Sequence, residues 1–445
     1  YFGLGWYEEA AQLASKLLER APEDASAHRL LALSLFRLGR PAEAEQHAEQ
    51  AAALEPAVPE AHLVLGHCRL AHGDHVLAEQ AYLAALALDS ACLEAHRSLA
   101  SLYNKLGAYS TALEHLAALV DAQPHSLAFR LEYAEALERS GRVEAAREQW
   151  RQILARAGNE PGALLAVGAA QRRAGLFQEA LSTLKKAVAL DPSAAQGFIE
   201  IALTLQAQGK LEEAVQELQA AAQRFTTDGR VHCELGRQYA ALGYREQAKQ
   251  ALATAIKCDP SLAEAHYEMA LLHQAEGNFE AALCACEAAI SAAPANATYR
   301  KLAGSLSLQL RRYGQAAQHL EAAQVAGDRD AQTLAMLGKA YQQLGRHEQA
   351  LAAFRQASDL DKGNGEYLAA VAESACALGR YNEAMNAAEE ALRLAPRNPR
   401  FHAAKARTLM AAGKPLLAAE VLRRAVLLPG GDALRPLLAA ALRSA

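Results

Sequence analysis

The sequence is poor in aromatic residues and contains no long apolar run. Phe, Trp and Tyr make up 6% of the 445 residues, although apolar residues as a whole make up 52%. Ala and Leu therefore supply the core, and they have the best helix propensities. Aromatic residues, which favour strands, are scarce. No apolar run approaches the ~18 residues of a membrane span, so we expect no membrane insertion.

The chain also lacks an excess of basic residues. It has 45 Lys and Arg against 50 Asp and Glu, a net charge of −5, which argues against a nucleic-acid partner because such domains are normally basic. Its seven cysteines are odd in number and show no metal-site spacing, which indicates reduced thiols and a cytoplasmic location. No signal peptide is visible, but the sequence begins at Tyr1 without Met and reads as a piece of a longer protein. Its Ala/Leu/Arg-rich composition suggests a bacterial source.

Catalytic motifs are missing as well. The sequence has no nucleophile elbow, phosphate loop or HExxH motif. Glu132, Glu135 and Glu138 share a helical face, but we interpret them as solvated charges without a raised pKa, because nothing apolar is expected around them. We therefore predict no enzyme activity, no cofactor and no metal site within these residues.

What the chain does have is a 34-residue period. Glycine recurs at that spacing from Gly5 to Gly413, at twelve of thirteen positions, and Arg311 occupies the remaining one. We call these thirteen places the turn positions. Alanine stands five residues after every one of them, from Ala10 to Ala418. A fixed period of this length indicates a stacked repeat array, in which each repeat contacts mainly its neighbours.

Each repeat is predicted to be a pair of helices. Between Ala263 and Pro294, apolar residues recur every three or four positions on both sides of Gly277, as on two amphipathic helices joined by a left-handed glycine turn. Only Ala or Gly occurs seven residues before each complete turn position. We expect the two helices to cross closely there, with the alanine five residues after the turn position as the partner. Proline seventeen residues after seven of the turn positions is expected to end the second helix.

This pattern resembles the tetratricopeptide repeat, a helix–turn–helix unit of 34 residues. Leu235-Gly236, Tyr239, Ala248, Leu252 and Pro260 fit the motif, with His232 in place of its tryptophan. The resemblance implies an all-α solenoid, a right-handed superhelix whose concave groove is lined by the first helix of each repeat and binds peptides or partner proteins. It divides the chain into residues 1–24 (second half of a truncated repeat), 25–432 (twelve repeats) and 433–445 (a capping helix, expected over 433–443, or the start of a truncated repeat).

Two further features are a recurring histidine, which is not part of the motif, and Arg311, which departs from the glycine pattern. Six histidines lie eleven residues before a turn position: His28, His62, His96, His232, His266 and His402. They lie on different helices with axes ~8–10 Å apart, too far for one zinc ion, so we interpret them as planar side chains that fill the tryptophan position. Arg311 is interpreted as a tolerated substitution with a slightly altered turn. The alternative is a softer joint, with Gly314 three residues later.

By similarity to the family, groove residues are expected 13, 10, 9, 6, 3 and 2 residues before each turn position. Basic and acidic residues there nearly balance once Glu132, Glu200, Glu234 and Glu268 are counted, so a basic groove is not predicted. A segmented groove is predicted instead, with a polar stretch, an apolar middle edged by glutamates, and a second polar stretch. The candidate peptide-binding residues are Arg97, Asn104, Lys105, Leu165, Arg172, Arg173, Ile199, Glu200, Leu203, Glu234, Arg237, Tyr267, Glu268, Lys301 and Lys339.

The predicted function is a protein–protein interaction scaffold or adaptor that binds an extended peptide or partner protein in the groove. Two alternatives stay open: the substrate-recruiting arm of a larger enzyme of glycosyltransferase or sulfotransferase type, and a bacterial envelope assembly or secretion factor. The family's lysine/asparagine carboxylate clamp and its asparagine ladder are not matched. If the groove leucines anchor the peptide, Leu165→Glu plus Ile199→Glu should abolish binding without loss of helicity; the other interpretation is that they pack on adjacent repeats.

Overall fold

The turns between paired helices all use the left-handed backbone conformation. In the computed structural model, which describes residues 6–445, the eleven glycines at described turn positions have φ between 72° and 86°. Arg311 adopts the same conformation, with φ 57°, so the repeat geometry is kept there at the expense of a conformation that L-residues with a Cβ disfavour. Gly5 lies outside the described residues.

The chain divides into two units, Tyr1–Ala214 and Val215–Ala445. The first contains α1 (Tyr7–Arg20), α2 (Ala25–Arg37), α3 (Pro41–Leu54), α4 (Pro59–His72), α5 (His75–Leu88), α6 (Leu93–Lys105), α7 (Tyr109–Ala122), α8 (Leu127–Arg139), α9 (Val143–Ala157), α10 (Pro161–Arg173), α11 (Phe177–Leu190) and α12 (Ala195–Ala207). Helix α13 (Leu211–Arg224) crosses the boundary.

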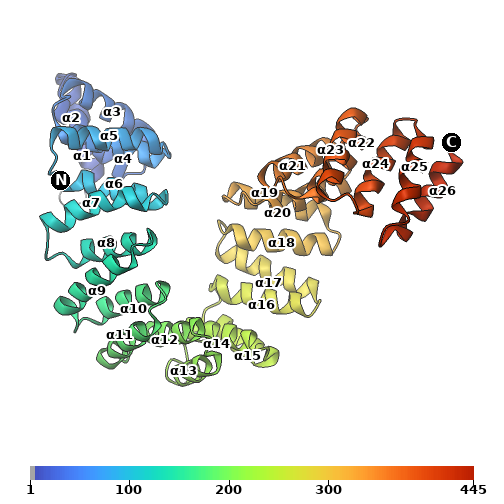
Figure 1. Cartoon of the computed structure of the whole chain (residues 1–445). Coiled ribbons are helices and arrows are strands. Elements are labelled where there is room, and N and C mark those ends of the chain that lie inside the picture. The colour runs from blue at the N-terminus through green and yellow to red at the C-terminus, as the bar shows by residue number, and fades with distance from the viewer. Residues whose placement is uncertain (1–5) are drawn as a thin grey trace. The chain divides into compact units, whose positions relative to one another are not determined.

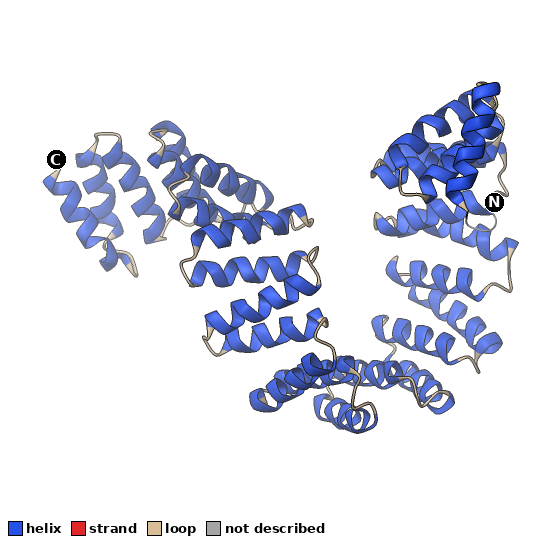
Figure 2. Cartoon of the chain, turned by 180° about the vertical axis from the view of Figure 1, so that it is seen from behind, coloured by secondary structure: helices blue, strands red, loops and turns tan. Residues whose placement is uncertain are grey.

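The second unit continues with α14 (Gly229–Ala241), α15 (Arg245–Cys258), α16 (Ala263–Ala275), α17 (Phe279–Ala292), α18 (Ala297–Gln309), α19 (Tyr313–Val325), α20 (Ala331–Gln343), α21 (His347–Leu360), α22 (Gly365–Ala377), α23 (Tyr381–Leu394), α24 (Pro399–Ala411), α25 (Pro415–Ala425), the 3-10 turn η2 (Gly431–Leu434) and α26 (Arg435–Arg443). Residues 6–445 contain no strand (Figure 2). Within each unit a helix packs mainly against its neighbours in the chain (Figure 1). The fold is an all-α solenoid, as the repeat predicts.

The close crossing within a pair involves the predicted alanine at Gly236, where an added Cβ would lie 3.2 Å from the Ala248 carbonyl oxygen, but the nearest contacts are made with another residue of the second helix. A Cβ added to Gly66 would lie 2.5 Å from the Tyr82 ring, and one added to Gly338 would lie 2.8 Å from the Phe354 ring. Both ring-bearing residues stand nine positions after the turn position, not five. The alanines five positions after it are almost fully buried, and they keep the second helix close. Glycine is thus needed where the facing side chain is large.

The histidine row closes the junction between successive repeats. His266 Nε2 donates to the Pro260 carbonyl oxygen at 3.0 Å, and Pro260 follows the end of α15 by two residues. The same bond, from residue i to the carbonyl of residue i−6, is made by His28, His62, His96, His232 and His402. Arg130 and Arg300 make it from the same register. Where a histidine or arginine occupies this register, it ties the first helix to the end of the preceding second helix, which is more than space filling.

The last predicted helix starts later than expected. The sequence predicts a helix from residue 433, whereas the structure has the 3-10 turn η2 up to Leu434 and then α26 from Arg435. Pro436 lies in the first turn of α26, where its missing N–H costs nothing and its fixed φ suits a helix start. Leu434 is buried, and Leu437 and Leu438 pack on the core formed with α24 and α25.

Candidate functional site

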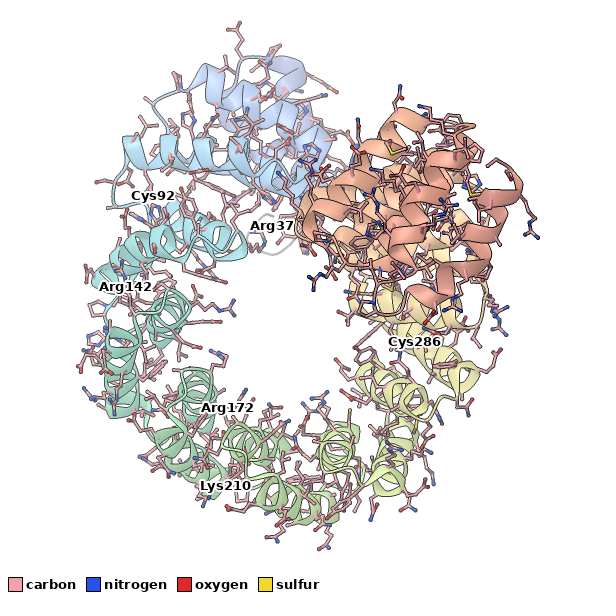
Figure 3. All side chains as sticks on the ribbon, turned by 45° about the vertical axis from the view of Figure 1, so that its right-hand side comes forward. Arg37, Cys92, Arg142, Arg172, Lys210 and Cys286 are labelled. Atoms are coloured by element: carbon pink, nitrogen blue, oxygen red, sulfur yellow. The ribbon has the colours of Figure 1, made fainter. Side chains whose placement is uncertain are left out.

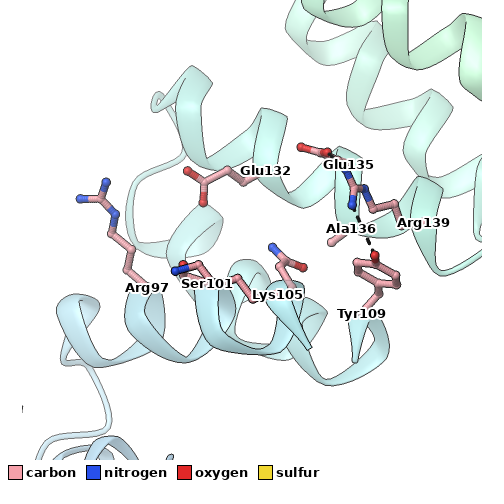
Figure 4. A pocket seen from close by; sticks show the side chains of 9 residues that line it. Arg97, Ser101, Lys105, Tyr109, Glu132, Glu135, Ala136 and Arg139 are labelled. Carbon is pink, nitrogen blue, oxygen red and sulfur yellow. Dashed lines mark hydrogen bonds and ion pairs between the residues drawn. The ribbon is translucent and has the colours of Figure 1, made fainter. Parts of the chain in front are cut away.

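A cavity of about 540 Å³ lies between the first helices α6 and α8 of the first unit (Figure 4). Arg97, Ser101, Asn104 and Lys105 of α6 line it, with Tyr109 of α7 and Glu132, Glu135, Ala136 and Arg139 of α8. Positions 97, 101, 104 and 105 share a face because residues three and four apart are neighbours on a helix. The structure thus brings the predicted Arg97, Asn104 and Lys105 to one cavity.

The cations of this cavity differ in how they are satisfied. Arg139 bonds Glu135 at 2.7 Å and the Tyr109 hydroxyl at 3.3 Å, and its guanidinium lies over the Tyr109 ring. Arg97 and Lys105, in contrast, make no ion pair or hydrogen bond to any part of the chain that the structure describes. Two cations are therefore available to a ligand.

Glu132 lies at the Arg97 end of the cavity (Figure 4). Burial raises the pKa of Glu132, and Arg97 partly opposes that rise. The expectation that these glutamates are simply solvated is wrong for Glu132, and also for Glu138, whose side chain is only 8% exposed. Packing of α8 against its neighbours removes water that an isolated helix would keep.

Asn104 adds an unsatisfied acceptor to the same cavity. Its Oδ1 is buried and has no hydrogen-bond partner. A buried polar atom without a partner costs ~1–3 kcal/mol, which a ligand N–H would recover. An amide oxygen beside an unpaired ammonium can hold a peptide N–H and a carboxylate together.

Further along the first unit, the predicted cations are already paired. Arg172 of α10 bonds Glu200 of α12 at 3.2 Å, and Arg173 bonds Glu138 of α8 through two contacts of 2.9 Å. Figure 3 shows Arg172 on the inner side of the stacked helices and Arg142 on the outer side. These charges join successive first helices to each other, so they are not free for a partner.

The predicted apolar anchors of the first unit differ in how deeply they are buried. Leu165 and Leu203 are half-buried, whereas Ile199 is 7% exposed and belongs to the core. Ile199→Glu would bury a charge and destabilise the fold. The pair Leu165→Glu plus Ile199→Glu would therefore lower helicity as well as any binding, contrary to the expectation above.

In the second unit the predicted residues form a closed network. Arg237 of α14 bonds Glu234 at 2.8 Å and Glu268 of α16 at 2.9 Å. Gln238 donates to Glu234 at 2.7 Å. Glu234 is 6% exposed, and the two carboxylates raise the pKa of Arg237 against the effect of burial. The arrangement is an internal ion-pair network.

The other predicted residues of the second unit are spread over three helices. The Tyr267 ring packs against the Tyr299 ring, with centroids 4.8 Å apart. Lys301 forms a 2.5 Å ion pair with Asp330. Lys339 on α20 is exposed and makes no ion pair among the described residues. Only Lys339 keeps an unpaired charge here.

The first unit has a second cavity, of about 730 Å³, between α2 and α4, where the sequence predicts no site. Leu30 and Leu33 of α2 and Leu63 and Val64 of α4 line it, and Glu94 of α6 reaches its rim. The signal was present, because Leu30 and Val64 occupy the register nine residues before a turn position. A single sequence does not show that apolar residues there leave a hollow.

The potential metal ligands among residues 6–445 are not grouped. No group of three or more His, Cys, Asp or Glu side chains there has metal-site geometry. The cysteines in this range are all unpaired, and burial raises the pKa of Cys68, Cys233 and Cys286 to about 12. These buried thiols are poor nucleophiles. Among the described residues, no helix is long and apolar enough to cross a membrane.

Several family models match the chain. Models described as "Tetratricopeptide repeat" match residues 1–54, 31–91, 63–126 and 165–229, residues 103–167, and residues 229–262. A model described as "Psidin, N-terminal TPR repeats region" matches residues 273–415. The search of curated proteins found no match.

Three solved structures show the kind of similarity that the chain has to known folds. YrrB, described as a TPR protein with an unusual peptide-binding site, is 18% identical with a TM-score of 0.41, over 42% of this chain and 97% of YrrB. PilF of Pseudomonas aeruginosa is 20% identical with a TM-score of 0.42, over 47% of this chain and 96% of PilF.

The Cut9–Hcn1 hetero-tetramer of APC/C gives 17% identity and a TM-score of 0.38, over 99% of this chain and 94% of the matched chain. At these values the similarity concerns the fold alone. The family models reach from residue 1 to residue 415 with a gap only at 263–272, and the chain therefore belongs to the tetratricopeptide repeat family.

Proposed function

We propose that the first unit binds an extended peptide and holds an acidic group of that peptide in the α6–α8 cavity. Membership of the tetratricopeptide repeat family supports a protein-interaction scaffold in general. The finer proposal rests on one observation: Arg97 and Lys105 are unpaired beside the unsatisfied Asn104 Oδ1, whereas Arg172 and Arg173 are paired.

The roles follow from the geometry. Lys105 supplies the charge for a carboxylate, and Asn104 Oδ1 accepts a peptide N–H. Arg97 faces Glu132, so it is partly compensated and adds a longer-range attraction. Charge-assisted hydrogen bonds are about twice as strong as neutral ones, which favours the Lys105 end for the acidic group.

A selection from a random twelve-residue peptide library tests this proposal. Peptides captured by the full chain should be enriched in Asp and Glu, and the enrichment should disappear with Arg97→Glu plus Lys105→Glu. The matched control is Arg142→Glu plus Lys185→Glu, which makes the same charge change at exposed positions of the same unit. Equal enrichment with both double variants would refute the proposal.

A further inference from the structure

The α2–α4 cavity has a chemical character opposite to that of the α6–α8 cavity. Its base is apolar, with Leu63 and Val64 buried and Leu30 and Leu33 half-buried. An apolar side chain placed there would lose contact with water, which contributes ~25 cal/mol per Å². The cavity is therefore suited to a large aliphatic or aromatic side chain.

The rim of this cavity is acidic. Glu55, Glu60 and Glu94 line it together with one cation, Arg29. None of these four side chains makes an ion pair or a hydrogen bond within residues 6–445. His67 also lines the cavity, and burial lowers its pKa, so it is neutral near pH 7. Three carboxylates and one guanidinium leave a net charge of −2, which favours a ligand with Lys or Arg beside its apolar residue.

The two cavities adjoin at α6. Glu94 lines the α2–α4 cavity, and Arg97, less than one helical turn later, lines the α6–α8 cavity. First helices of successive repeats are about 10 Å apart, so two repeats separate the cavity centres by about 20 Å. An extended peptide covers that distance with about six residues.

We infer that the first unit recognises a single bipartite peptide: a large apolar residue flanked by Lys or Arg in the α2–α4 cavity, and an Asp or Glu about six residues away in the α6–α8 cavity. The acidic half rests on the proposed function above. The apolar and basic half rests on the α2–α4 cavity alone. Linking two weak contacts raises affinity when the linker spans the sites.

Four fluorescein-labelled synthetic peptides test the inference by anisotropy with the full chain. In the first, a four-residue Gly/Ser spacer joins Lys-Leu-Lys to Asp-Glu, so that Asp stands six residues after Leu. The second has Ser in place of Lys-Leu-Lys, the third has Ser in place of Asp-Glu, and the fourth has the spacer shortened to two residues. We expect the first to bind about tenfold tighter than each of the others. Glu60→Lys plus Glu94→Lys should remove this advantage without weakening the binding of the acid-only peptide, because Glu94→Lys adds positive charge near Arg97.

The outcomes separate the two proposals. If the acid-only peptide binds but Lys-Leu-Lys adds nothing, or if Glu60→Lys plus Glu94→Lys changes nothing, the bipartite inference is wrong and the proposed function stands. If the Lys-Leu-Lys end binds whereas the acidic end makes no contribution, the proposed function and the bipartite ligand both fail. Binding of a second copy of the chain, seen by sedimentation without peptide, would also overturn the inference.

Discussion

The first-helix surfaces of α6–α8 and α14–α16 both carry cations at the predicted groove registers, yet these cations differ in how their charges are satisfied. In the first unit, Arg97 and Lys105 are unpaired at a cavity. In the second, Arg237 is held by Glu234 and Glu268. The repeat fixes where a side chain lies, whereas the residue on the next first helix decides whether it is available to a partner.

The difference matters for energetics as well as for binding. In a network such as Glu234–Arg237–Glu268, the attraction between the charges offsets the free-energy cost of removing them from water. Unpaired surface cations stay hydrated in the folded protein and contribute little to the free energy of unfolding. We therefore expect substitutions of the second set to change folding and substitutions of the first set to change binding.

The largest expected effect is that of Arg237→Ala. It would leave Glu234, which is 6% exposed, without its cation. Breaking a buried pair costs ~3–5 kcal/mol, and we expect about 2–3 kcal/mol because the Arg237 side chain is one-third exposed and screened. Urea denaturation followed by circular dichroism measures the loss. If Arg237→Ala and Arg97→Ala have equal midpoints, the contrast between the two surfaces is wrong.

Arg311→Gly should give a smaller, opposite effect. A left-handed residue with a Cβ costs ~1–2 kcal/mol, and glycine's greater freedom in the unfolded chain returns ~0.4–1 kcal/mol of that. We expect a net stabilisation of about 0.5–1 kcal/mol, visible as slower hydrogen exchange of α18 and α19. Gly345→Arg, the reverse change at a glycine with φ 73°, is the control and should destabilise. Unchanged exchange in both variants would show that the turn does not require glycine geometry.

A pH effect of still smaller size should distinguish the units. In the first, His28 and His47 face each other with Nδ1 atoms 3.1 Å apart, and His96 and His115 do so at 3.0 Å. Burial, and then the facing histidine, lower the pKa of His47 and His115, whereas Glu43 and Glu114 act in the opposite sense. A lowered folded pKa means that the unfolded chain binds more protons below its value of ~6.5.

The stability from these pairs is therefore present above pH ~6.5 and is lost as the pH falls below it. In the second unit only His319 has a resolved decrease in pKa. Hydrogen exchange between pH 7.5 and 5.5 should show the first unit losing protection more than the second. His47→Gln plus His115→Gln should reduce that loss, and an unchanged loss would count against the histidine pairs.

The smallest expected effect on stability is that of Arg97→Ala plus Lys105→Ala. Neither side chain has an internal ion pair, so we expect a change within ~0.5 kcal/mol. Thermal melting of this variant beside the wild type measures it. A loss above 1 kcal/mol would mean that the two cations are structural.

The sequence predicts most of the fold. The period, the alanines and Gly277 correctly place α16 and α17, because the positions that form a solenoid core repeat every 34 residues. The sequence does not predict that Gly66 packs against Tyr82 and Gly338 against Phe354. These contacts depend on how far one helix of a pair is shifted along its axis relative to the other. The late start of α26 could have been predicted, because Pro436 is a sequence signal for the first turn of a helix.

The site is predicted less completely. The registers name Arg97, Asn104 and Lys105, which line one cavity, as well as Arg172, Glu200, Glu234 and Glu268, which lie in ion pairs; their part in peptide binding stays a prediction. Whether a charged side chain is free depends on ion pairs between residues 28 to 35 positions apart in the sequence. Counting the charges at each register does not reveal which of them form such pairs. Burial of Ile199 and the hollow at Leu30 and Val64 likewise arise from packing between repeats.

The most direct test compares Lys105→Met with Lys301→Met. Both remove one ammonium from a first helix, but Lys105 is unpaired at the cavity and Lys301 is bound to Asp330. The measurement is the calorimetric affinity of one Asp/Glu-containing peptide from the library for each variant. We expect at least ~10-fold weaker binding for Lys105→Met and wild-type affinity for Lys301→Met. Equal affinities for the two variants would contradict it.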